Sequence, residues 1–237
     1  MAIITLFSTL AKDTLVDNDG NTIKEQVGGP AFYLLKIFRK EKISTITKLA
    51  GPVGVQILVN EYGEFGKIPK IPKKIKIDFK KVNTPFSVIS TLLDEFNLQS
   101  LDKYKGKIFL DIQGYVRDGL NFGKKQSWRP PPEIMNNIFC LKGTEEELSY
   151  LPEKFLRIQK QKILLITRGG KGCKVFTNEK FFTVKPDQII ETSDTIGTGD
   201  TFFAYFIAQF LKTGDVVASG QWATEQTARF LTQKLSS

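Results

Sequence analysis

Along the first half of the chain, the spacing of apolar residues changes back and forth between two patterns. Short apolar runs of strand length, such as Ile3–Phe7, are followed by stretches with apolar residues at helical spacing, such as Pro30–Arg39 after a double glycine. These patterns predict short strands separated by helices. The predicted strands cover residues 3–7, 43–49 and 107–112. The predicted helices cover residues 30–39, 53–62 and 85–97. One or two further strands are expected in the lysine-rich segment before residue 81.

The second half continues the alternation and adds clearer signals. Thr144 and Glu147 have the spacing of a capping box, which predicts that a helix begins after a strand at 137–141. A strand over 162–167 precedes a glycine-rich turn, and Asn178-Glu179 separates two runs that form a predicted hairpin, 173–177 and 181–184. Two long helices, 201–212 and 216–235, are predicted to close the chain.

Repeated strand–helix alternation predicts a mostly parallel sheet with helices on both faces, hence one three-layer α/β domain over residues 1–237. Ligands bind beyond the carboxyl ends of the strands in such sheets. Asp111, Lys142, Thr167 and the loop 194–200 all follow predicted strands. We therefore expect them to gather at one edge of the sheet.

The composition limits which residue types could bind a metal or act in catalysis. The 237 residues include no histidine and two cysteines, Cys140 and Cys173, which excludes Cys/His zinc sites and Ser-His-Asp triads. Any acid–base group must be a carboxylate, Lys, Tyr or Cys. No apolar run is long enough to predict a membrane span, and the N-terminal residues resemble a first strand rather than a leader, so a cytoplasmic protein is expected.

The net charge of +9 raises the question of a nucleic-acid partner. Much of the excess lies in the lysine-rich segment 66–76, whose alternating Ile and Lys residues equally suit a half-exposed strand. No nucleic-acid-binding motif accompanies it. We expect neither a nucleic-acid nor a membrane partner.

The loop before the first of the two closing helices has the composition of an anion site. A helix start exposes unpaired N–H groups, and Gly197 and Gly199 allow close approach of a ligand. Asp200 would repel a phosphate but suits a base that takes a proton from an attacking hydroxyl. The alternative is an Asp that merely caps a structural helix.

The longer segment Asp194–Phe202 resembles the D-T-x-G-A-G-D signature of the ribokinase, or PfkB-type, carbohydrate and nucleoside kinases. Other motifs follow in the family's order. They are the double glycine in Val27-Gly28-Gly29-Pro30-Ala31, the strand end Asp111-Ile112-Gln113-Gly114, Lys142-Gly143-Thr144-Glu145-Glu146-Glu147, and the turn Thr167-Arg168-Gly169-Gly170-Lys171-Gly172. The resemblance implies a ribokinase-like domain with a mostly parallel sheet and a β lid.

The same resemblance implies an ATP- and Mg²⁺-dependent kinase that phosphorylates a hydroxyl of a small sugar, polyol or nucleoside. It makes Asp200 the catalytic base, and it makes the backbone of Gly197, Thr198 and Gly199 the anion hole. Glu147 would orient metal-bound water. The implied ATP-binding residues are Lys142, Thr167, Gly169, Gly172 and Thr195, and the implied substrate-binding residues are Asp13, Gly28, Gly29 and Asp111.

The chain departs from the family pattern in three respects. It is short, so the lid is expected to be reduced to residues 63–81, which leaves lid-mediated homodimerisation open. Thr144 replaces the usual Asn, and Tyr33 stands where many sugar kinases have Asn.

Several roles have alternatives at this point. Asp111 is either structural or substrate-facing, and Asp13 contacts substrate or lies in a turn. Arg117 and Arg129 either meet a substrate phosphate or are solvated. A non-catalytic small-molecule-binding protein of the same fold is the alternative function.

Overall fold

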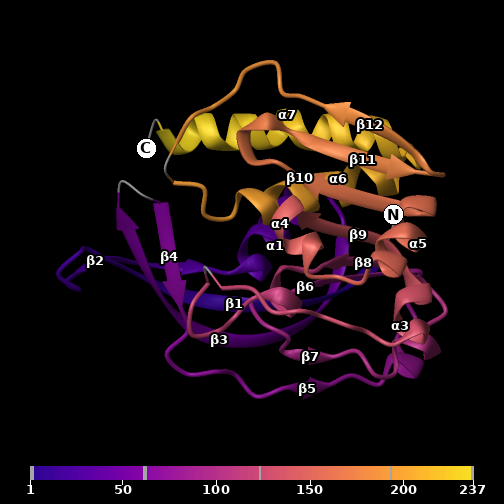
Figure 1. Ribbon diagram of the computed structural model, residues 1–237, viewed down its shortest axis with the longest axis horizontal. Helices are drawn as coiled ribbons and strands as arrows, with labels where there is room; N and C mark the ends of the chain where they lie inside the picture. The colour runs from indigo at the N-terminus through magenta and orange to yellow at the C-terminus, as the bar shows by residue number, and fades with distance from the viewer. Residues whose placement is uncertain (1–2, 61–62, 123, 193, 236–237) are drawn as a thin grey trace.

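The computed structural model describes residues 3–60, 63–122, 124–192 and 194–235, which form a ten-stranded sheet with helices on both faces (Figure 1). Six strands are parallel to their neighbours in the centre of the sheet: β1 (Ile3–Val16), β3 (Ser44–Asn60), β6 (Phe86–Ser90), β8 (Lys107–Asp111), β9 (Ile138–Thr144) and β10 (Ile163–Thr167). The remaining strands pair antiparallel. At one end of the sheet β11 (Cys173–Thr177) pairs with β10 and β12 (Lys180–Val184) with β11, at the other end β4 (Gly63–Lys67) pairs with β3, and β2 (Thr22–Gly28) pairs with β1. The predicted fold class is confirmed.

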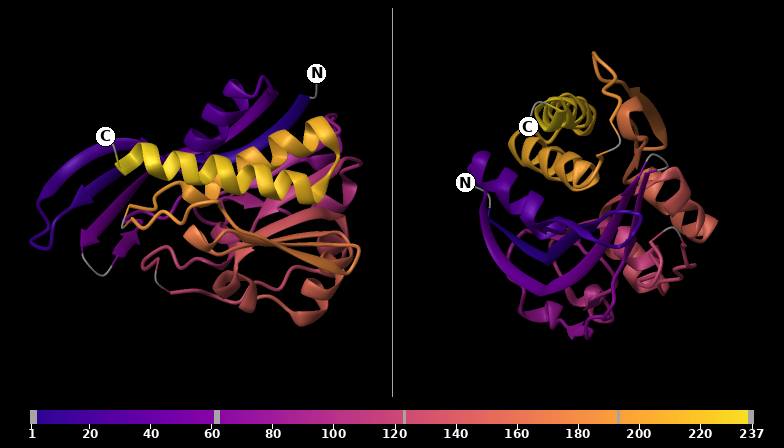
Figure 2. Two further views of the ribbon diagram at one scale, coloured as in Figure 1. Left: turned by 90° about the horizontal axis from the view of Figure 1, so that it is seen from above. Right: turned by 90° about the vertical axis from the view of Figure 1, so that its left-hand side faces the viewer.

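Three long helices cover one face of the sheet (Figure 2). They are α1 (Pro30–Lys40), α6 (Thr198–Thr213) and α7 (Val216–Leu235). Helix α6 is apolar almost all round because it lies between α1 and α7 and against the sheet, which buries nearly every side chain from Asp200 to Ala208. Its start is therefore held rigidly at the edge of the sheet.

The opposite face is covered by shorter elements. They are β5 (Ile75–Lys76) and β7 (Phe96–Asn97), which pair with each other, the helices α2 (Gln113–Val116), α3 (Pro132–Asn137), α4 (Glu145–Ser149) and α5 (Glu153–Gln161), and the 3₁₀ turns Phe79–Lys81 and Leu101–Lys103. A third 3₁₀ turn, Gly169–Lys171, follows β10. Both faces of the sheet are apolar because each face is covered by other elements. In β1, Leu6 packs in the core under α1 and α6, and its neighbour Phe7 packs in the core on the opposite face.

Two predicted helices are strands. Residues 53–60 of the segment 53–62 continue β3, because Val53, Val55 and Ile57 alternate toward a buried surface at the strand period (residues 61 and 62 lie outside the described residues). Within 85–97 the chain forms β6 and then β7, with Val88 and Ile89 packed on opposite faces of the sheet. Short apolar runs of this kind fit either period.

Strands β1 and β3 extend beyond the sheet layer and pair there with β2 and β4 (Figure 1). We call residues 11–16, 22–28, 53–60 and 63–67 the β extension. The role of residues 63–81 as a lid stays a prediction. Only residues 63–67 belong to the extension, because the Pro-containing segment after Ile68 runs under the sheet and includes β5. No helix of the described residues is both long and apolar enough to cross a membrane.

Candidate active site

The loop before α6 forms a tight turn that opens toward a groove. Gly197 caps the helix in the left-handed conformation, with φ of 76°, and its carbonyl accepts from the N–H of Thr201 at 2.9 Å. The N–H of Thr198 donates to the carbonyl of Thr195 at 3.0 Å. Among the described residues the N–H groups of Gly197, Gly199 and Asp200 have no protein acceptor. These N–H groups of the turn remain available to an anion, whereas that of Thr198 is used within the turn.

Both glycines of the loop lie close to neighbouring side chains, Gly197 more closely than Gly199. A Cβ on Gly197 would lie 2.2 Å from a ring carbon of Tyr33, and a Cβ on Gly199 would lie 3.0 Å from Nζ of Lys142. The Tyr33 ring thus covers the side of the loop that faces α1. Its neighbour on α7 is Phe230, with the two ring centroids 6.1 Å apart.

Asp200 lies in the first turn of α6 with only 8% of its surface exposed. Burial raises the pKa of its carboxyl to about 7, against the opposing charge of Lys142. The hydroxyl of Ser90, at the end of β6, lies 3.5 Å from Oδ1 of Asp200. A carboxylate with a pKa near 7 is well matched to proton transfer at neutral pH.

A buried ion pair lies beneath the glycine loop. Nζ of Lys142 and Oδ2 of Asp111 are 2.8 Å apart, and both side chains are almost fully buried. Burial disfavours the charge on Lys142, but the carboxylates of Asp111 and Glu147 outweigh it and raise the pKa of the ammonium group. Asp111 also accepts from Ser90 at 3.3 Å. This geometry favours the structural alternative for Asp111, since its carboxylate is occupied by Lys142.

The capping box predicted at the start of α4 is confirmed. The N–H of Thr144 donates to Oε2 of Glu147 at 2.8 Å, and the N–H of Glu147 donates to Oγ1 of Thr144 at 3.1 Å. Thr144 therefore uses its side chain within the cap. Glu147 is 6% exposed and lies on the wall of the groove.

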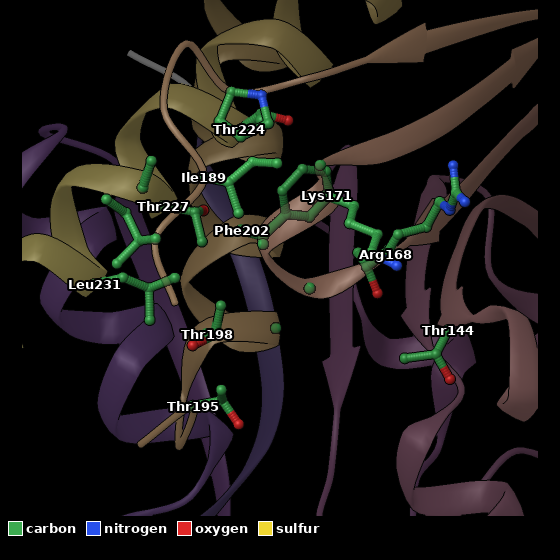
Figure 3. Close-up of a pocket in the computed structure, with 18 of the residues that line it drawn as sticks. Thr144, Arg168, Lys171, Ile189, Thr195, Thr198, Phe202, Thr224, Thr227 and Leu231 are labelled. Carbon is green, nitrogen blue, oxygen red and sulfur yellow. The ribbon is translucent and has the colours of Figure 1, made fainter. Parts of the chain in front are cut away.

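The groove has a volume of about 550 Å³ and lies between the glycine loop, the turn after β10, α4 and α7 (Figure 3). Eight predicted residues line it: Lys142, Glu147, Thr167, Gly169, Gly172, Thr195, Thr198 and Gly199. Arg168 and Lys171 lie on one side of the groove, and Phe202, Ile189 and Leu231 lie on the other (Figure 3). One part of the groove is thus polar and basic, and the other is apolar.

Three of the predicted substrate residues, Asp13, Gly28 and Gly29, belong to the β extension or adjoin it. Asp13 lies in β1, where it pairs with β2, rather than in a turn; it is 3% exposed, and burial raises the pKa of its carboxyl to about 6. A Cβ on Gly28 would lie 1.8 Å from Oδ2 of Asp13. Gly29, with φ of 79°, would bring a Cβ within 2.7 Å of the carbonyl of Thr9. The double glycine therefore makes room for Asp13 and for the close approach of α1 to β1.

Several residues at the site were not assigned from the sequence. Ser90 contacts Asp200, and Gln113 lines the groove. Both positions result from long-range packing, which no local sequence pattern indicates. The α7 residues on the groove wall have a detectable signal, because Thr224, Thr227 and Leu231 recur at helical spacing on one face.

Comparison with known families gives a match over the C-terminal half of the chain. Residues 126–236 match the family model described as pfkB family carbohydrate kinase. A protein assigned as a sugar kinase in Pyrococcus horikoshii is 33% identical over 117 residues, which are 45% of this chain and 37% of that protein. The matches span about a third of the length of the curated relatives.

Solved structures resemble this fold over nearly the whole chain. A pyrophosphate-dependent kinase in the ribokinase family, solved with sulfate, has a TM-score of 0.73 and 16% identity, and the match covers 94% of this chain and 93% of that one. Ribokinase of Arabidopsis thaliana, solved with ribose and ATP, has a TM-score of 0.68 and 16% identity, with 94% and 91% coverage. The class defined by the fold and the site is thus that of the ribokinase-fold proteins.

The C-terminal part of the chain is thus similar to pfkB family carbohydrate kinases, and the chain as a whole has the ribokinase fold, which agrees with the predicted resemblance.

Proposed function

We propose that the protein is a kinase that transfers the γ-phosphoryl group of ATP, with Mg²⁺, to a hydroxyl of a small sugar, polyol or nucleoside. The observation that carries the proposal is the start of α6. There a buried carboxyl with a pKa of about 7, Asp200, adjoins the unoccupied N–H donors of a helix start at the end of a groove. A positioned base and an anion site are the main demands of phosphoryl transfer.

In the proposed step the Asp200 carboxylate takes the proton of the acceptor hydroxyl. The hydroxyl oxygen forms a bond to the γ-phosphorus as the bond from that phosphorus to the β–γ bridging oxygen breaks. The electron pair of the broken bond leaves with ADP, and Asp200 later releases the proton to solvent. The N–H groups of Gly199 and Asp200 bind the charge on the transferred group, and buried Lys142 adds positive charge beneath them.

The shape of the groove favours a nucleotide donor. Ile189, Phe202 and Leu231 form an apolar wall against which a purine base can pack. Pyrophosphate has no apolar group that could contact this wall. Arg168 and Lys171 supply positive charge near the phosphates. Because one similar structure is a pyrophosphate-dependent kinase, the donor itself requires a test.

The donor set fits a magnesium ion held through water and phosphate. No three acidic, Cys or His side chains of the described residues cluster as a metal cage, and Mg²⁺ characteristically binds one or two carboxylates while keeping several waters. Glu147 is the carboxylate on the groove wall, and its Oε1 is not used in the capping box. Bound Mg²⁺ would neutralise the charge of the donor phosphates.

The proposal is tested by product formation over donors and acceptors. Purified protein would be given ATP, GTP or pyrophosphate, with pentoses, hexoses, polyols and nucleosides as acceptors, and Asp200→Asn would be assayed beside it. The proposal expects one acceptor class to be phosphorylated from ATP, with loss of turnover in the variant. ATP binding without phosphorylation of any acceptor would instead favour a binding protein of the same fold.

A further inference from the structure

Arg117 is half-buried and contacts Gln113 of the groove wall, whereas Arg129 is exposed on a remote loop. The carboxylates whose charges act most strongly on Arg117 are, in order, Glu147, Asp200, Asp111 and Glu95. None of them forms an ion pair with it within 4.0 Å in the described part of the chain. Lys142, the buried cation of the site, is already paired with Asp111. Arg117 is thus a cation without a carboxylate partner in an acidic site.

Neutral groups hold the guanidinium in place. It stacks on the ring of Phe122 at 4.2 Å, and its Nη1 donates to the carbonyl of Leu92 at 3.4 Å. The amide oxygen of Gln113 accepts from Nη2 at 2.9 Å and from Nη1 at 3.2 Å, in the amide orientation that pairs donors with acceptors. A guanidinium has five N–H donors in a fixed fork, so donors remain for a ligand.

These contacts locate Arg117 where the donor groove meets the acceptor side. Gln113 and Glu147 both line the groove. Asp200 lies at the start of α6, next to Gly199 of the groove wall, and its charge also acts on Arg117. A γ-phosphoryl group in the groove, within reach of an acceptor at Asp200, would occupy the space between them.

The segment that carries Arg117 is also bonded to the β extension. The N–H of Ile68 donates to the carbonyl of Gly119 at 2.8 Å, and the N–H of Phe122 donates to the carbonyl of Gly66 at 2.9 Å. A Cβ on Gly66 would lie 2.2 Å from the Phe122 ring. The ring on which Arg117 stacks is therefore fixed by β4.

We propose that Arg117 is a catalytic residue whose guanidinium binds the γ-phosphoryl group of the donor, so that ATP and ADP differ in whether they contact it. This inference rests on the proposed kinase function. The physical need is clear, because a γ-phosphoryl group beside the Asp200 carboxylate is repelled unless an unpaired cation offsets the charge. Arg suits this role, since its fork matches phosphate oxygens and it remains charged when buried.

The test compares binding of ATP and ADP, in Mg²⁺, by isothermal titration calorimetry. For Arg117→Gln we expect a loss of about tenfold to a hundredfold in ATP affinity, as for a lost charge-assisted hydrogen bond, with ADP affinity changed less than about twofold. Arg129→Gln is the matched control and should leave both affinities unchanged. Arg117→Lys, which keeps the charge but not the fork, should lose ATP affinity to an intermediate extent, and it serves if Arg117→Gln does not fold.

Two outcomes overturn the inference. Equal losses for ATP and ADP would mean that Arg117 merely supports the structure, and unchanged ATP affinity would mean that it does not meet the γ-phosphoryl group. Failure of the proposed function looks different, because the wild-type protein would then bind neither nucleotide. If it binds pyrophosphate instead, the same variants are compared between pyrophosphate and orthophosphate with the same expectation.

Discussion

The groove side and the extension side of the glycine loop are built from different parts of the chain. The groove comes almost entirely from residues after 113, and the family model matches residues 126–236. Asp13, the double glycine and the β extension come from the first 67 residues, where the likeness to ribokinase-fold structures is one of fold. The groove side therefore carries most of the sequence match to the family model, whereas the extension side resembles these structures in fold. We refer to the two sides by their proposed roles as the donor half and the acceptor half.

This difference between the two halves suggests that the side chains of the acceptor half determine which acceptor is bound. In the acceptor half Tyr33 lies against Gly197, and an apolar cluster that includes Val55, Leu93 and Phe122 lies under the extension. Substitutions on the two sides should separate donor effects from acceptor effects.

The largest effect is expected where the two halves meet, at Asp200. Asp200→Asn removes the base while keeping the shape of the side chain, so kcat should fall by about 10²–10⁴-fold. ATP affinity should stay within a few-fold of wild type, since the groove is unaltered. Steady-state kinetics and calorimetry measure the two quantities, and a variant with wild-type kcat would contradict the assignment.

A substitution confined to the acceptor half should leave the affinity for the phosphoryl donor unchanged. Asp13→Asn weakens a charge-assisted hydrogen bond to the acceptor, so the acceptor KM should rise about tenfold or more while ATP affinity is unchanged. Asp19→Asn, an exposed carboxylate in the turn between β1 and β2, is the control and should alter neither. An Asp13 variant that lost ATP affinity instead would remove the distinction between the two sides.

The start of α6 can be tested against its end. Gly197 and Gly214 both have left-handed backbone, with φ of 76° and 70°, so Ala at either position should cost about 1–2 kcal/mol of unfolding free energy. Only Gly197→Ala also meets the Tyr33 ring, whereas nothing lies within 4 Å of a Cβ on Gly214. Urea unfolding should therefore show losses in both variants, with the greater loss and reduced kcat in Gly197→Ala alone. Equal kcat in the two variants would argue against the anion site.

The smallest effect concerns the apolar wall of the groove. Ile189→Asp places a polar, negative group where the nucleotide base is proposed to lie, and ATP affinity should fall by a few-fold to about tenfold. Ile71→Asp is matched in exposure, 59% against 60%, and lies outside the groove. An Ile189 variant with unchanged ATP affinity but altered pyrophosphate affinity would point to the other donor.

The donor half was also the better predicted half. The Thr144–Glu147 cap, the hairpin at Asn178-Glu179 and the two closing helices depend on local signals, and the structure confirms each of them. Asn178 and Glu179 both have positive φ, as a tight two-residue turn requires. Local chemistry of this kind can be read without knowledge of the fold.

The acceptor half depends on long-range pairing. Residues 53–60 were expected to be helical, and only their pairing with β1 and β4 makes the strand evident. The contact between Ser90 and Asp200 likewise depends on strand order, since the two residues lie far apart in the sequence. No spacing in the sequence could have predicted that Arg117 contacts Gln113 at the groove while Arg129 is exposed elsewhere.

The most direct test of Asp200 as a buried base is the pH dependence of kcat/KM for the acceptor that the protein phosphorylates. Because burial raises the pKa of Asp200 to about 7, the active carboxylate is lost as the pH falls through that value. Wild-type kcat/KM should therefore fall tenfold per pH unit below about 7, and the residual rate of Asp200→Asn should lack this limb. A wild-type limb near pH 4, or the same limb in the variant, would contradict the account.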